Sequence, residues 1–174
     1  MRSIDIANLF IQRHGNKLYL TNLSLNKLVY FAQVEALKSR PYKPLFDDCI
    51  QAWNYGPVEP VVYHVFKDRG TSQITVPSAD IQNDDDLPFA IAIVDFVAEK
   101  YGSLTAFDLV NISHSEGGAW RKKFNGTHNV PITIEDIMQS DDYLSSFDPN
   151  RTFGAAIQNV RESFPNALRM LEDA

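Results

Sequence analysis

Four consecutive residues, Ser113 to Glu116, combine two hydroxyls, an imidazole and a carboxylate. Such a set could support hydrolysis, either through an activated serine or through a metal ion bound by His114 and Glu116. A nucleophile and its base must meet at hydrogen-bond distance, however, and adjacent side chains at a helix end point in different directions. We therefore expect these residues to cap backbone groups at a helix junction. A hydrolase or metalloenzyme that uses His114 and Glu116 is the least favoured function.

The other residues that could bind a metal or a nucleotide lack the spacing that this chemistry needs. The histidines are His14, His64, His114 and His128. They show neither helical i, i+4 spacing nor a zinc-binding motif. Gly117 and Gly118 are not followed by the lysine and hydroxyl of a phosphate-binding loop, and the chain has no GxSxG elbow. The sequence therefore predicts no catalytic residue, no metal and no cofactor.

Aromatic residues surround a proline turn between Trp53 and Tyr63, where the sequence reads WNYGPVEPVVY. Large aromatic side chains are buried on average, so one interpretation is a rigid corner packed inside the domain. The other interpretation is a preorganised platform for a protein partner, because tyrosine and tryptophan dominate interface hot spots and a rigid turn loses little entropy on binding. Both can hold for different residues. The predicted protein-binding residues are Trp53, Tyr55, Pro57, Tyr63, His114 and Trp120.

Apolar residues at helical spacing dominate the chain and indicate which elements hold these side chains. Helices are predicted at 4–14, at 23–39, from the Gly56-Pro57 turn to Gly70, at 87–102, after a Thr105 cap, at 115–120, after a Thr133 cap and at 153–171. Short β-prone stretches are expected at 48–54 and 73–76. The predicted fold class is mainly α, a single compact helical domain over residues 1–174 with a minor short β element.

Composition and charge narrow the classes of partner. The 174 residues are 44% hydrophobic and 22% charged, which is ordinary for a globular protein. The formal net charge of -6 argues against nucleic-acid binding, because that binding needs clustered lysines and arginines. The same negative charge favours a basic protein partner. No stretch approaches the roughly 18 apolar residues of a membrane span, so no membrane partner is expected. The single cysteine, Cys49, and the lack of a signal peptide predict a cytoplasmic location.

A set of linked motifs between residues 24 and 124 resembles a known family. The motif residues are Leu25, Lys27 to Gln33, Pro44 to Phe46, Asp48, Ile50, Ala52, Trp53, Tyr55 to Val58, Pro60, Val61, Tyr63 and Phe66. A looser match continues through Tyr101, Gly102, Leu109, Ser113, His114, Glu116, Ala119 and Trp120. This ordered set resembles the Panacea, or SocA-like, antitoxin domain, also described as phage-associated GepA-type protein.

The resemblance implies a predominantly helical domain, encoded beside a toxin, that neutralises this cognate toxin by forming a direct complex. The SocA branch of the family is described as an adaptor that delivers its toxin to the ClpXP protease, which gives a second mechanism. The family offers no catalytic residues that could be carried over to this chain. We therefore expect an antitoxin that binds a cognate protein toxin, with delivery of the toxin to ClpXP as the alternative.

Overall fold

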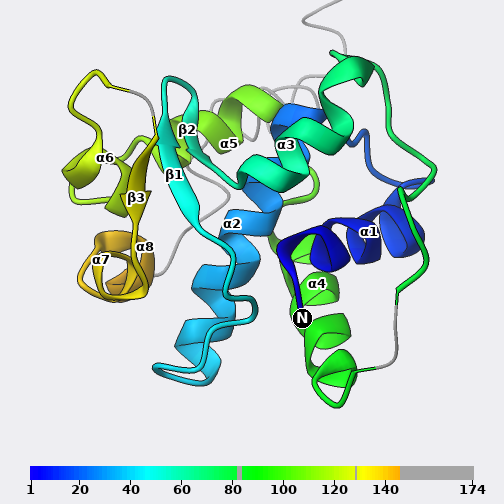
Figure 1. Ribbon diagram of the computed structural model, residues 1–174, viewed down its shortest axis with the longest axis horizontal. Coiled ribbons are helices and arrows are strands. Elements are labelled where there is room, and N and C mark those ends of the chain that lie inside the picture. The colour runs from blue at the N-terminus through cyan, green and yellow to red at the C-terminus, as the bar shows by residue number, and fades with distance from the viewer. Residues whose placement is uncertain (82–83, 128, 146–174) are drawn as a thin grey trace, which may run out of the picture.

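A long buried helix, α2 (Asn22–Ser39), forms the centre of the molecule (Figure 1). The structure is a computed structural model, and it describes residues 1–81, 84–127 and 129–145. Thr21 caps the first turn of α2, because its hydroxyl accepts a 3.2 Å hydrogen bond from the Ser24 amide. Nearly every side chain of α2 is buried, polar ones included. The other elements therefore pack around this helix.

Two helices on one side of α2 form much of the hydrophobic core. They are α1 (Ser3–His14) and α4 (Leu87–Tyr101), which contact α2 and each other. Asp95 links the two helices at their surface, because it accepts a 2.5 Å hydrogen bond from Arg13 and lies 2.8 Å from Nε2 of His14. The two helices therefore pack together against α2.

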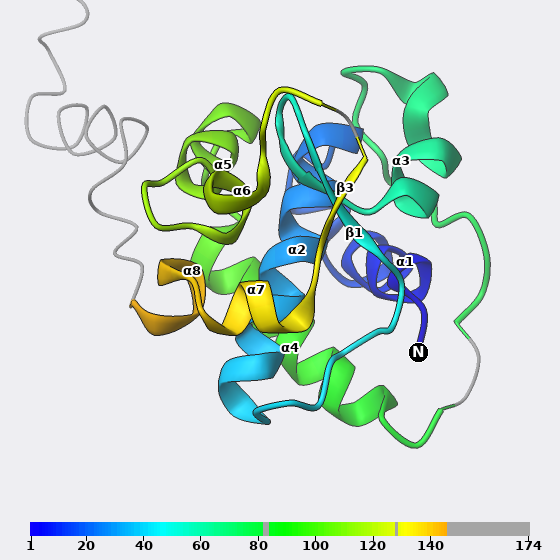
Figure 2. The same ribbon diagram turned by 60° about the vertical axis from the view of Figure 1, so that its left-hand side comes forward.

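Three short antiparallel strands lie on the other side of α2, in the order β2-β1-β3 (Figure 1), and Figure 2 shows β1 and β3 side by side. They are β1 (Ile50–Trp53), β2 (Gly56–Val58) and β3 (Val130–Ile132). Strands β1 and β2 form a hairpin in which Trp53 pairs with Gly56, so Asn54 and Tyr55 make a two-residue turn. Because β2 packs against α2, the turn projects from a fixed base.

Short helices complete the described part of the fold. They are α3 (Pro60–Phe66), the 3-10 helix η1 (Lys67–Arg69), α5 (Ala106–Ser113), α6 (Ala119–Lys123), α7 (Ile134–Met138) and α8 (Asp141–Leu144). Side-chain oxygens of Glu59, Thr105 and Thr133 cap α3, α5 and α7. None of the helices in the described ranges combines the length and the apolar character that crossing a bilayer requires.

The predicted mainly α fold with a small β element is confirmed. The helices expected at 4–14, 23–39 and 87–102 are present, as are those expected after the Thr105 and Thr133 caps. The helix predicted at 153–171 falls outside the described residues. Sequence periodicity and local capping were sufficient for these helices because both signals are contained within each segment.

The prediction that a helix starts at the Gly56-Pro57 turn is wrong. These two residues belong to strand β2, where Pro57 pairs with Ala52 of β1. The helix begins at Pro60 instead, because the Glu59 side chain accepts a hydrogen bond from the Val62 amide and caps the first turn. The proline at the first helical position is therefore the second proline of the motif.

Two further local predictions are wrong and one strand was missed. No strand forms at 73–76, where Ile74 donates a single 2.7 Å backbone hydrogen bond to Leu20 and no ladder follows. Helix α6 starts at Ala119 rather than at 115, because Gly117 has a φ of 79° that interrupts the helix. Strand β3 escaped prediction because it contains Pro131, which a strand tolerates only at a sheet edge.

Candidate protein-binding site

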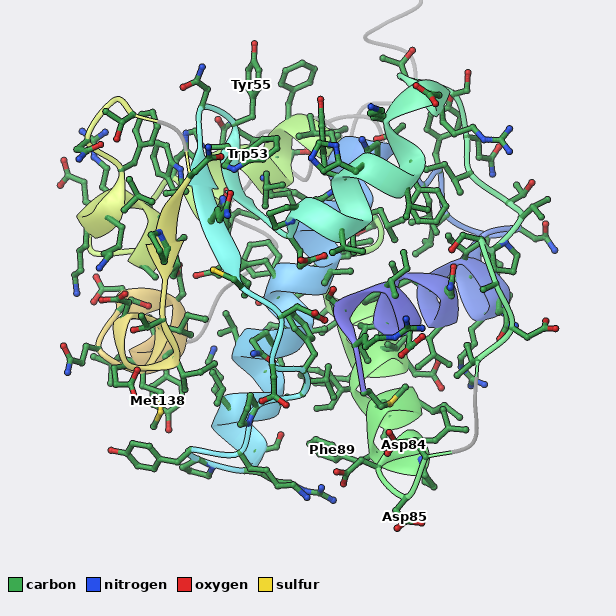
Figure 3. The ribbon with its side chains drawn as sticks, in the orientation of Figure 1. Trp53, Tyr55, Asp84, Asp85, Phe89 and Met138 are labelled. Carbon is green, nitrogen blue, oxygen red and sulfur yellow. The ribbon has the colours of Figure 1, made fainter. Side chains whose placement is uncertain are left out.

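The hairpin turn presents two of the predicted aromatic side chains, Trp53 and Tyr55 (Figure 3). Trp53 ends β1, and its ring meets the ring of Tyr63 from α3 edge-on, with centroids 4.9 Å apart. Its indole nitrogen donates a 3.0 Å hydrogen bond to Gln51, which fixes the ring. Tyr55 is 65% exposed. The hairpin and α3 therefore bring three aromatic side chains together, two of them partly buried and one open to solvent.

A hollow of about 370 Å³ opens between these rings and the first turns of α2. This aromatic hollow is lined by residues that include Asn22, Leu23, Asn26, Trp53, Tyr55, Val58, Tyr63 and Lys67. Two of the three asparagine amides in its wall are already engaged. Asn26 Nδ2 donates to Asn22 Oδ1 at 3.0 Å, and Asn22 Nδ2 donates to the Tyr63 carbonyl at 3.2 Å. The hollow therefore offers mainly apolar and aromatic contact to a ligand.

Lys27 of α2 holds the hairpin from beneath. Its side chain is fully buried, and its ammonium nitrogen donates a 2.8 Å hydrogen bond to the Pro57 carbonyl. Burial lowers the pKa of Lys27 to about 7. Gly56 makes this approach possible, because a Cβ there would lie 2.6 Å from Ser113 Oγ and 2.9 Å from Cε of Lys27. The strand, the lysine and the end of α5 are thus in close contact.

Trp120 and His114 support the hairpin from its other side. Trp120 is 3% exposed, and its indole nitrogen donates a 2.8 Å hydrogen bond to the Trp53 carbonyl. The His114 ring stacks on Trp120 with centroids 3.6 Å apart. Its Nε2 is buried and has no hydrogen-bond partner among the described residues. Burial, helped by the charges of Lys27 and Arg121, lowers the pKa of His114 to about 4, so the ring is neutral at pH 7.

The structure divides the six predicted binding residues into two groups. Trp53, Tyr55 and Tyr63 line the aromatic hollow. The other three are support residues that lie beneath or beside the hairpin: Pro57, His114 and Trp120. The partner platform therefore stays a prediction for Trp53, Tyr55 and Tyr63, while the support residues pack within the described structure.

The Ser113 to Glu116 cluster does not form a nucleophile and base pair in the described structure. Ser113 is buried and its hydroxyl donates a 2.8 Å hydrogen bond to the Val110 carbonyl. His114 faces Trp120, while Ser115 and Glu116 are exposed. Within residues 1–81, 84–127 and 129–145, no three His, Cys, Asp or Glu side chains gather as a metal site would require. The geometry favours a structural role for this stretch.

Sequence reasoning missed Lys27 and the two asparagines that α2 contributes to the hollow. The signal was present, because Asn22, Asn26 and Lys27 interrupt the apolar pattern of a helix that proves to be buried on all sides. A buried lysine needs an acceptor, and here the acceptor is a backbone carbonyl of a different element. Because every residue carries a backbone carbonyl, the sequence cannot indicate which one accepts this hydrogen bond.

Comparison with known proteins supports the resemblance in the motifs. The family model described as antitoxin SocA-like, Panacea domain, matches residues 25–121, which include all six predicted binding residues. Antitoxin SocA of Caulobacter vibrioides (strain NA1000 / CB15N) is 32% identical over 141 residues, which cover 72% of this chain and 73% of that relative. No solved structure matches the chain significantly. The chain therefore belongs to the family of SocA-like antitoxins with a Panacea domain.

Proposed function

We propose that this chain is an antitoxin that neutralises a cognate protein toxin by direct binding, and that the toxin contacts the aromatic hollow. The observation that carries the proposal is the position of Trp53, Tyr55 and Tyr63 around one apolar hollow at the surface. Tyrosine and tryptophan are the residues that most often dominate binding energy at protein interfaces. Family membership supports the antitoxin role.

Rigidity of the hairpin supports the same proposal. The Trp53 carbonyl accepts a hydrogen bond from Trp120, and the Pro57 carbonyl accepts one from Lys27, so both strands are held. A surface that is ordered before binding loses little conformational entropy in the complex. A stable complex buries about 1,200 to 2,000 Å² in total, so the toxin also covers surface around the hollow.

The first test is co-expression of this chain with the product of the adjacent gene, in cells with and without ClpXP. We expect growth to be rescued and the two proteins to purify together, whether or not the protease is present.

In the purified complex, Tyr55→Ala should raise the Kd for the toxin about tenfold or more, because truncating a central aromatic anchor costs at least about 1.4 kcal/mol. Phe96→Ala is the matched control, since Phe96 is also exposed and lies outside the hollow. No rescue and no complex with the wild type would contradict the proposal.

Delivery of the toxin to ClpXP is the second candidate, because the chain is 32% identical to a SocA antitoxin. It predicts that growth rescue disappears in cells without the protease, although a complex still forms.

The hydrolase alternative predicts a different pattern. His114→Ala or Glu116→Ala would then abolish rescue while leaving folding and toxin binding intact. Normal rescue by both variants would remove the enzyme hypothesis.

A further inference from the structure

A second hollow, of about 560 Å³, adjoins the aromatic hollow. The two share Leu23 and Gly70 in their walls, so they meet at the start of α2. The second hollow lies among the segment before α2, the end of η1 and the loop from α4 to α5. Two aromatic residues stand at its edge, Tyr19 at 67% and Phe107 at 72% exposure. With Tyr55, three strongly exposed aromatic side chains surround the combined surface.

The combined surface is nearly uncharged. Lys67 is the one charged residue among the described residues that line either hollow, although 22% of the chain is charged. The centres of protein interfaces show this same composition, depleted of charges and enriched in aromatic residues. Acidic side chains lie elsewhere, and Figure 3 places Tyr55 and Asp85 at opposite ends of the molecule.

Several polar groups in the second hollow are already satisfied within the chain. The Thr105 hydroxyl donates a 2.7 Å hydrogen bond to Asp108, and the Thr21 hydroxyl accepts from the Ser24 amide as the cap of α2. The Tyr19 hydroxyl donates to the Thr71 carbonyl at 3.3 Å. A partner that covers this surface therefore need not supply hydrogen bonds to these groups. Apart from Lys67 in the aromatic hollow, the lining offers no opposite charge that would replace the lost hydration of a charged partner group.

Resting on the proposed function, we infer that the two hollows form one docking groove for an uncharged segment of the cognate toxin. The segment presents one bulky apolar side chain to each hollow and crosses Leu23 between them. Three exposed aromatic residues around two adjoining hollows match the composition that the centres of protein interfaces favour. The scarcity of charge in the groove, where Lys67 is the one charged lining residue, favours an uncharged occupant because a charged segment would lose more hydration than it regains.

Two pairs of variants test the groove, with the product of the adjacent gene as the probe. Phe107→Ala should raise Kd about tenfold or more, as Tyr55→Ala does, whereas Phe96→Ala should change it less than about twofold. Thr71→Lys places a charge in the second hollow and should also raise Kd about tenfold or more. Ser72→Lys is its matched control, because Ser72 is the next exposed residue and does not line the hollow. Amide hydrogen exchange should slow at 19–23 and 102–107 in the complex.

The outcomes separate this inference from the proposed function. If Tyr55→Ala weakens the complex while Phe107→Ala and Thr71→Lys leave Kd unchanged, the groove is wrong and the direct complex stands. If the wild type fails to bind the adjacent gene product, the proposed function and the groove both fail. Sedimentation of the free chain as a dimer that Phe107→Ala dissociates would assign the groove to a second copy. Binding to lipid vesicles that Phe107→Ala abolishes would assign it to a membrane surface, and either result overturns the inference.

Discussion

Lys27 connects the chemistry of one buried side chain to the position of the proposed binding hairpin. Its ammonium group lies in the core, where the Pro57 carbonyl accepts its hydrogen bond. Burial lowers the pKa of this group from about 10.4 in an unfolded chain to about 7. At pH values between these two, the unfolded chain binds more protons than the folded chain. Stability must therefore rise with pH across this window and fall as pH drops toward 7.

Replacing Lys27 with methionine tests this linkage. Between about pH 7.5 and 9.5, the wild-type free energy of unfolding should increase by about 1 kcal/mol per pH unit relative to Lys27→Met. Urea unfolding at several pH values measures the difference. Burial also raises the pKa values of Tyr30 and Tyr101, but their contribution is the same in both proteins and cancels in the comparison. Lys17 is exposed, so Lys17→Met is the control and should keep the wild-type dependence of the unfolding free energy on pH. If wild type and Lys27→Met show the same change of unfolding free energy with pH, Lys27 keeps its normal pKa.

At the level of the elements, strand β2 approaches α2 and the end of α5 only because residue 56 is glycine. Gly56 has a φ of 103°, and a Cβ there would collide with Ser113 and Lys27. Gly56→Ala should lower the free energy of unfolding by about 2 kcal/mol or more, from backbone strain and the collision together. Chemical denaturation measures this loss.

Gly126→Ala is the matched control for that substitution. Gly126 has a φ of 86°, but among the described residues beyond its chain neighbours no atom lies within 4 Å of the position that a Cβ would take. Its substitution should therefore cost only the strain of a positive φ, about 1 to 2 kcal/mol. If Gly56→Ala and Gly126→Ala lower the free energy of unfolding equally, the collision of the new Cβ with Ser113 and Lys27 adds nothing to the backbone strain.

The elements also show which features a sequence can reveal. Helix starts were predictable where a cap such as Thr105 or Thr133 lies three residues from its partner. The pairing of Ala52 with Val130 was not predictable, because it joins segments far apart in the chain and neither segment alternates clearly. Aromatic enrichment pointed to Trp53, Tyr55 and Tyr63, but the hollow also needs side chains from α2. The second hollow depends entirely on how separate loops pack, so no local pattern indicated it.

At the scale of the whole molecule, charged residues are nearly absent from the lining of the two hollows. The net charge is -6, yet Lys67 is the one charge among the described residues lining the two hollows. Figure 3 shows Asp84 and Asp85 at the end of the molecule away from Tyr55. Long-range attraction to a basic toxin and short-range packing against it should therefore depend on different residues. The first acts mainly on association and the second mainly on dissociation.

Charge reversal away from the groove tests this separation. Asp47 and Asp85 are exposed and lie outside both hollows. The double variant Asp47→Lys and Asp85→Lys should lower the association rate constant several-fold at an ionic strength of about 0.01 M, where the Debye length is about 30 Å. Its dissociation rate should match the wild type, whereas Tyr55→Ala should mainly raise the dissociation rate. Biosensor kinetics with the adjacent gene product measure both rates, and about 1 M salt should abolish the effect of charge reversal alone. Faster dissociation of the double variant, removed by the same high salt, would mean that the acidic residues enter the interface itself.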